Sequence, residues 1–200
     1  MPKSKFSVTH KDESVLELVR TTHHRALAVW AVDCVERVMP YFEGEYPKDR
    51  RPRKAIEACR EWMHTGVFKM ADIRRAALAS HAAAREVGED NAARSAARAA
   101  GQAVATAHVP THSVGAANYA LQAIYRATNS SHVDAAIAKE RDWQYQHLLD
   151  LRKNQRKKRL CRQRTNKTSR RLLNSLCWSS RVPKGTAEWR HKQNVGWMAT

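Results

Sequence analysis

Two histidines, His108 and His112, stand on either side of Pro110 in a run of small residues, "AVATAHVPTHSVGAANYA", which covers residues 103–120. Imidazole is the commonest metal ligand in proteins and a frequent general acid or base. The spacing therefore raises two interpretations. The histidines form a metal or catalytic site, or they mark a corner where one helix ends and the next begins.

A zinc site needs at least three protein ligands, and His81 is a further histidine in the same alanine-rich region. A helical hairpin that turns near residue 89 places His81 opposite residue 97 or 98. His108 then lies about ten residues further along, which is about 15 Å at the rise of an α-helix. The histidines are therefore predicted to mark a structural corner, with His108 near the C-terminal end of a helix.

The acidic residues that could do acid–base work or bind a divalent ion form two pairs on predicted helices, Asp33 with Glu36 and Glu57 with Glu61. Arginines at positions 37, 53 and 60 stand within a turn of these pairs, so ion pairs are favoured over a catalytic site. The sequence has no glycine-rich phosphate loop, nucleophile elbow or HExxH motif. No catalytic residue, metal site or cofactor is predicted, and an enzyme would need histidines and carboxylates to converge in one pocket.

Apolar residues recur every three or four positions along most of the chain, which is the spacing of an amphipathic helix. Residues 22–43 are predicted to form one helix, with Asp33 and Arg37 spaced as an ion pair on its polar side. Its apolar stripe consists of Leu27, Trp30, Cys34, Val38 and Phe42.

A second helix is predicted over residues 52–65. Pro52 suits the first turn of this helix and Gly66 suits its end. Arg53 and Glu57 have the spacing of a supporting ion pair.

Alanine dominates residues 71–127, where it accounts for 21 of 57 positions. Three helices are predicted there, over 70–87, 90–108 and 111–128. The middle helix carries an alanine face that would let helix axes approach closely, formed by Ala92, Ala96, Ala99, Ala103 and Ala107. Two glycines are predicted to relieve tight crossings, Gly101 near Asn118 or Tyr119 and Gly115 near Ala105.

The predicted fold class is all-α, a single alanine-rich bundle of about six to seven helices with a basic, disordered C-terminal tail. Periodicity alone leaves an orthogonal or a solenoid-like arrangement open. A last helix begins near Ser131 and continues through Val133, Ile137, Trp143, Leu148 and Leu151. The predicted organisation is an N-terminal segment with a short helix (1–21), a helical domain (22–152) and a basic tail of low order (153–200).

Positive charge is concentrated at one end of the chain. Residues 1–150 contain 21 Lys and Arg against 18 Asp and Glu, whereas residues 151–200 contain 15 against the single Glu188. Isolated tryptophans stand among these basic residues at positions 178, 189 and 197. Such a segment favours disorder, and it also leaves open non-specific nucleic-acid binding through the tail. Whether the tail is a selected extension or a frameshift product stays open.

The four cysteines show no CxxC pair and no metal-ligand spacing. Cys34 and Cys59 fall on apolar stripes, so we expect them to be small core residues in a reducing compartment. The N-terminus lacks the apolar run of a signal peptide, and no stretch of about twenty apolar residues could span a bilayer. A cytoplasmic protein with no membrane partner is predicted.

Four blocks resemble, in order, segments of a bacterial family of Imm-five-like immunity proteins. They are "WAVDCVERVMPYFEGEYPKDRRPRKAIEACREW", "AALASHAAARE", "AARAAGQAVATAHVPTHSVGAANYA" and "ERDWQYQHLLDLR". The similarity spans residues 22–152 and does not cover the basic tail. It implies a mostly helical, cytoplasmic protein that binds a cognate toxin of a polymorphic toxin system and blocks it without chemistry of its own.

The candidate partner-binding residues are polar or aromatic side chains that stand in alanine-rich or aromatic surroundings, at helix ends and corners. They are Asp33, Glu36, His81, His108, His112 and Trp143.

Overall fold

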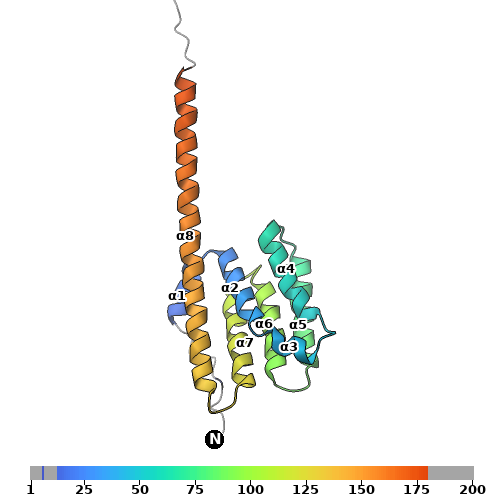
Figure 1. Cartoon of the computed structure of the whole chain (residues 1–200). Coiled ribbons are helices and arrows are strands. Elements are labelled where there is room, and N and C mark those ends of the chain that lie inside the picture. Colours follow the sequence, from blue (N-terminus) through green and yellow to red (C-terminus); the bar gives the residue numbers. More distant parts are fainter. Residues whose placement is uncertain (1–5, 7–12, 180–200) are drawn as a thin grey trace, which may run out of the picture. The chain divides into compact units, whose positions relative to one another are not determined.

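The computed structural model describes residue 6 and residues 13–179, and the side chains at 158, 161, 162 and from 164 onward lie outside that description. Within the described residues the chain is all-α, as predicted (Figure 1). The helices are α1 (Glu13–Thr21), α2 (His24–Glu36), α3 (Met39–Glu45), α4 (Arg51–Thr65), α5 (Met70–Glu86), α6 (Ala92–Ala105), α7 (His112–Ala127) and α8 (Val133–Ser179). The chain divides into two compact units, residues 1–157 and 158–200, and the first contains the packed helices described below.

The eight described helices slightly exceed the predicted six to seven, and Pro40 explains part of the difference. The segment predicted as one helix over 22–43 breaks between α2 and α3, with Pro40 in the first turn of α3. Proline has no N–H to donate to a carbonyl one turn earlier, so a helix cannot run through this position unchanged. The predicted apolar stripe is nevertheless correct, since each of its five residues is at most 1% exposed.

The residues predicted to begin and end α4 are confirmed. Pro52 lies in the first turn, and Gly66 caps the C-terminus with φ = 73°, in the left-handed region. Glycine adopts this conformation without the steric cost that a Cβ would add.

α6 lies at the centre of the first unit, where it packs closely against α2, α3, α4, α5 and α7. Side chains of two neighbours bond to its backbone: Ser80 Oγ donates to the Ala97 carbonyl (2.8 Å) and Cys59 Sγ to the Ala103 carbonyl (3.4 Å). A helix that is enclosed by five others needs small side chains on most of its surface. The predicted alanine face is therefore interior, and Ala92 is its most exposed member at 8%.

The two glycines in this region are sites of close approach, but their nearest neighbours differ from those predicted. A Cβ on Gly101 would lie 2.8 Å from Cε1 of His81, and a Cβ on Gly115 would lie 2.8 Å from Oε1 of Gln102. The glycines therefore make room for side chains of α5 and α6. The predicted approaches of Asn118, Tyr119 or Ala105 are not the closest ones.

Replacement of Gly101 by alanine tests this packing. Alanine is favoured over glycine in a helix interior by about 1 kcal/mol, but the added Cβ would displace the His81 ring. We expect Gly101→Ala to stabilise an His81→Ala background by about 1 kcal/mol and the wild type by clearly less. Urea unfolding of the four proteins in this double-mutant cycle measures the difference, and equal effects in both backgrounds would contradict the contact.

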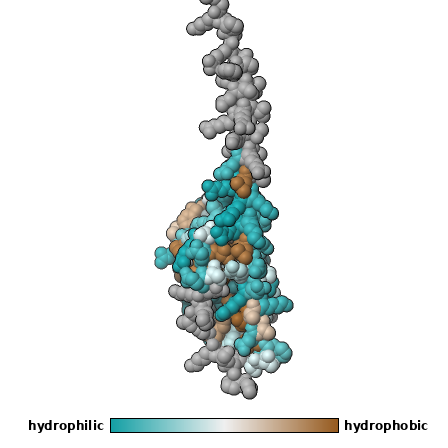
Figure 2. Space-filling view, turned by 90° about the vertical axis from the view of Figure 1, so that its left-hand side faces the viewer, coloured by the Kyte–Doolittle hydropathy of each residue, from teal (hydrophilic) through white to brown (hydrophobic). Residues whose placement is uncertain are grey.

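The first part of α8 packs against α2 and α7. The indole Nε1 of Trp30 donates to the Gln144 carbonyl (2.9 Å), and Nε2 of Gln144 donates to the Ala117 carbonyl (3.3 Å). The face to which α1 and α8 contribute is mostly hydrophilic, with hydrophobic side chains only in small patches (Figure 2).

The backbone of α8 remains helical to Ser179, beyond the end predicted from the apolar pattern. The rest of the expected low-order tail, residues 180–200, lies outside the described residues. Within the described part of the chain, no helix combines the length and apolar character required to cross a bilayer.

Candidate functional site

Arg37 and Glu140 form a bidentate ion pair between α2 and α8. Arg37 Nη2 lies 2.8 Å from Glu140 Oε2, and Arg37 Nε donates to both carboxylate oxygens at 3.0 and 3.1 Å. The Glu140 side chain is only 3% exposed. The ion pair predicted between Asp33 and Arg37 is therefore wrong. A buried carboxylate without a partner is costly, and Arg37 satisfies the one on α8.

Asp33 and Trp143, two of the predicted partner-binding residues, belong to the same α2–α8 contact. The Arg37 guanidinium carbon lies 3.9 Å from the centroid of the Trp143 ring. The ring of His147 stacks on Trp143 at 4.9 Å, and its Nε2 lies 2.7 Å from Asp33 Oδ2. Both predicted residues therefore have intramolecular partners that hold α8 against α2.

Sequence reasoning missed Glu140 and Gln144 because it followed apolar residues alone. Both are buried on α8, and with Val133 and Leu148 they share one helical stripe. Their spacing was the available signal. A Glu and a Gln at core positions of a helix must find partners when they are buried.

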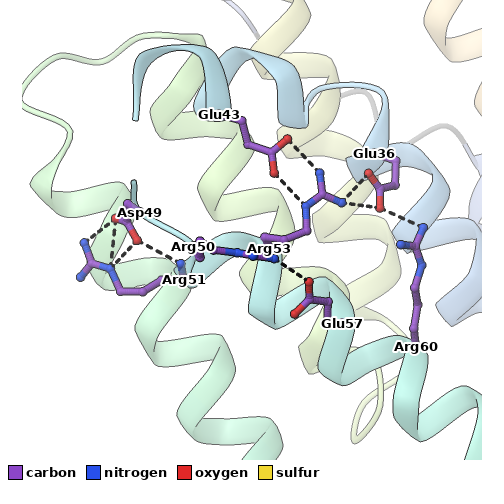
Figure 3. A network of polar contacts seen from close by, with 8 residues as sticks. All are labelled: Glu36, Glu43, Asp49, Arg50, Arg51, Arg53, Glu57 and Arg60. Atoms are coloured by element: carbon purple, nitrogen blue, oxygen red, sulfur yellow. Dashed lines mark hydrogen bonds and ion pairs between the residues drawn. The ribbon is translucent and has the colours of Figure 1, made fainter. Parts of the chain in front are cut away.

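Glu36 belongs to a second network, which joins α2, α3 and α4 (Figure 3). Arg53 bonds to Glu36 at 2.7 and 2.8 Å and to Glu43 at 2.8 and 2.9 Å. Arg60 lies 2.9 Å from Glu36 on the other side. The hydrogen bonds from Arg53 lower the pKa of Glu43.

The pair predicted between Arg53 and Glu57 is wrong, since Glu57 pairs with Arg50 at 3.1 Å and Arg53 reaches the two carboxylates of α2 and α3 instead. Glu36 is thus held by two arginines of α4.

The three predicted histidines gather at one end of α6. His108 lies in the turn between α6 and α7, and its ring centroid is 5.1 Å from that of His112. His112 Nδ1 is 2.7 Å from Gln102 Oε1. His81, on α5, reaches Gly101, about one helical turn beyond the predicted residues 97 and 98. Thr111 stands at the N-cap of α7, but its side chain makes no capping hydrogen bond.

Burial is the main cause that lowers the pKa of His81, followed by the positive charges of Arg98, Arg85 and His112. Burial and His108 likewise lower the pKa of His112. Both effects favour neutral imidazoles at the surface of this corner.

A pH dependence of stability follows from His81. Its pKa is lower in the folded state than the value of about 6.5 expected in the unfolded chain. Below pH 6.5 the unfolded chain binds the proton first, so stability is greatest above that pH and falls as the pH drops toward the folded pKa. We expect an NMR titration midpoint of His81 below 6.5, and a smaller loss of stability between pH 7.5 and 5.5 in His81→Gln. A midpoint at or above 6.5 would contradict the buried, positively charged surroundings.

A groove lies between the polar stripe of α6 and the exposed side of α7. Its cavity volume is about 700 Å³. Among the described residues of its lining, the arginines are Arg94, Arg98 and Arg126 and the acidic residue is Asp90. Phe6 also lines it and packs on Tyr125, with ring centroids 5.3 Å apart.

Among the described residues, no group of three or more His, Cys, Asp or Glu side chains is placed to hold a metal ion. Asp33 and Glu36 bond to His147, Arg53 and Arg60 rather than to the three histidines. A catalytic site would need those carboxylates and the three histidines to lie together in one pocket.

A family model described as "Imm-5 like putative immunity protein" matches residues 17–151, well over half of the 200-residue chain. The chain belongs to this family. The resemblance predicted from the four sequence blocks is thereby confirmed. No match was found among curated proteins or among solved structures.

All six predicted partner-binding residues lie within the segment that matches the Imm-5 like family. The structure separates them into groups: Asp33 and Trp143 in the α2–α8 contact, Glu36 in the arginine network, and the three histidines at the corner of α6. The basic segment after residue 151 lies outside the family match, and nucleic-acid binding through it stays a prediction.

Proposed function

We propose that this chain binds a cognate toxin and neutralises it by protein–protein contact. The family match over residues 17–151 carries the proposal, because it describes immunity proteins and includes α2 to α7 and the first part of α8. Neutralisation then requires occlusion of the toxin and no chemical step by this chain.

The surface that best fits this role is the polar face of α5, α6 and α7. We call it the α5–α7 face and define it by His81, Arg94, Arg98, Gln102 and His112. These side chains are half-buried, which leaves them accessible on a supported surface. His108 is exposed beside them. Asp33, Glu36 and Trp143 are weaker candidates because they already join helices to one another.

The α5–α7 face is supported by a rigid scaffold. Eleven of the 14 residues of α6 are buried, and the three half-buried positions are Arg94, Arg98 and Gln102. Binding groups on a fixed backbone lose little conformational entropy when a partner docks.

Coexpression with a cognate toxin, sought among the genes beside this one, tests the proposal. The full chain is expected to restore growth to cells that express this toxin, and to form a complex with the purified toxin. Killing that continues while folded chain accumulates would overturn the proposed function.

A further inference from the structure

The described residues that line the groove between α6 and α7 carry more positive than negative charge. Arg94 lies 3.8 Å from Asp90, and Arg126 pairs with the same carboxylate. One acidic side chain is thus shared by two guanidinium groups. Arg98, the third arginine of the lining, has no carboxylate within ion-pair distance among the described residues, and its described contact is with the ring of Tyr119 at 5.8 Å.

The flanking guanidinium groups are held in place by further bonds. Arg94 Nε donates to the Ala84 carbonyl at 3.1 Å, which ties it to α5. Arg126 Nη1 donates to Ser95 Oγ at 2.6 Å and to the Asn91 carbonyl at 3.3 Å. The positive field around Arg98 is therefore fixed before any partner arrives. Arg98 and Arg94 both act to lower the pKa of Arg126, after the larger effect of burial and against Asp90.

Neutral hydrogen-bonding groups share the groove with the arginines. Asn118 and Gln122 lie one turn apart on α7, and Tyr119 lies between them in sequence. Gln122 Oε1 accepts from Ser95 Oγ at 3.2 Å, which fixes the amide with its N–H groups as the donors toward a partner. Primary amides can donate to and accept from a peptide backbone, and an arginine binds a carboxylate through two parallel N–H groups. A volume of about 700 Å³ has room for several side chains of a partner.

We propose that the α6–α7 groove receives a carboxylate-bearing segment of the toxin, with Arg98 as its central ion-pair partner. Asn118 and Gln122 bind the backbone of that segment, and Arg94 and Arg126 set the positive field. This proposal rests on the proposed function and specifies where the toxin docks and what chemistry the docking segment presents.

A protein carboxylate fits the groove better than a nucleic acid does. Nucleic-acid binding needs positive charge that tracks a run of phosphates, whereas residues 1–150 exceed neutrality by only three charges. The arginines here are gathered in one groove, which suits a single carboxylate better than a run of phosphates. A single acidic segment with hydrogen-bonding backbone groups matches this mixture.

Charge reversal at Arg98 tests the proposal in the full chain. We expect Arg98→Glu to weaken binding of the cognate toxin at least 100-fold, Arg98→Gln about tenfold, and Arg98→Lys least. Lys54→Glu is the matched control, since Lys54 is exposed on α4 and the substitution changes the net charge equally. Isothermal titration calorimetry gives the affinities, and thermal unfolding verifies that each variant is folded.

A second measurement identifies the partner group. Each Asp and Glu of the toxin is replaced by Lys in turn and titrated with Arg98→Glu. The proposal expects one such change to restore binding at least tenfold, and this readout does not depend on the stability of the variant.

The outcomes separate the two proposals. If the wild-type chain does not bind the toxin, the proposed function fails and the docking proposal fails with it. If the wild-type chain binds, but Arg98→Glu binds as tightly or is weakened only as much as Lys54→Glu, the docking proposal is overturned and the proposed function stands. Binding of a short nucleic acid that Arg98→Glu abolishes, with toxin binding unchanged, would also overturn it.

Discussion

Glu140→Ala is expected to lower the free energy of unfolding by about 1.5–3 kcal/mol, the usual contribution of hydrogen bonds to a charged group, because Arg37, the partner left behind, is 40% exposed and keeps its contact with water. The Glu140 side chain is 3% exposed, it accepts three hydrogen bonds from Arg37, and it accepts another from Gln144. Its loss leaves the Arg37 guanidinium beside Trp143 without its carboxylate, and leaves a cavity between α2 and α8.

Glu57→Ala is the matched control. Glu57 also pairs with an arginine, Arg50, but both side chains are more than half exposed. Exposed pairs contribute about 0–1 kcal/mol, so this variant should unfold almost as the wild type does. Urea unfolding monitored by tryptophan fluorescence and by circular dichroism measures both. Equal effects of the two substitutions would show that α8 is held by other contacts.

The second large effect is expected at the centre of the bundle. Ala96 is fully buried on α6, which five helices surround. Leucine at this position adds three carbon atoms where the backbones are close, and overpacking of this kind costs about 1–3 kcal/mol. We expect Ala96→Leu to lie at the upper end, about 3 kcal/mol, because neighbours on several sides cannot all shift.

Ala138→Leu provides the comparison for this substitution. Ala138 is exposed on α8, so a leucine side chain there extends into solvent. This substitution should change the free energy of unfolding by no more than about 0.5 kcal/mol. Both variants exchange alanine for leucine within a helix, so the effect of helix propensity is nearly the same in each. The difference between their free energies of unfolding therefore measures the cost of overpacking. If the Ala96→Leu protein is as stable as the Ala138→Leu protein, the alanine face of α6 is not closely packed and the prediction is wrong.

Features that depend on the periodicity of one helix were predictable from the sequence. The apolar stripe of 22–43 and the alanine face of α6 follow from the 3.6-residue repeat, and both are buried. The ends of α4 followed from the local chemistry of Pro52 and Gly66. The all-α class could therefore be deduced before any coordinates, whereas the family membership followed from the resemblance of the four sequence blocks.

Partners of charged side chains were not predictable in the same way. The expected pairs assumed that Arg37 and Arg53 would bond within their own helices. In the structure Arg37 pairs with Glu140, 103 residues away, and Arg53 with Glu36 and Glu43. Local spacing offers an exposed pair worth a few tenths of a kcal/mol, and a buried carboxylate on another helix competes for the same arginine far more strongly.

The candidate site was only partly accessible to sequence reasoning. The three histidines were found, but the hairpin register was off by about one turn, which hid the contact between His81 and Gly101. The α6–α7 groove was missed because its residues are contributed by two helices, by the turn before α6 and by Phe6.

The burial of α6 has a consequence for how such proteins diversify. Its structural residues and its outward residues occupy different codons, and the outward set includes Arg98 and Gln102. Under the proposed function, mutations at these outward codons would alter which toxin the molecule binds and leave the buried framework unchanged. A duplicated copy of the gene would then acquire a new target through a few nucleotide changes, without first losing its ability to fold.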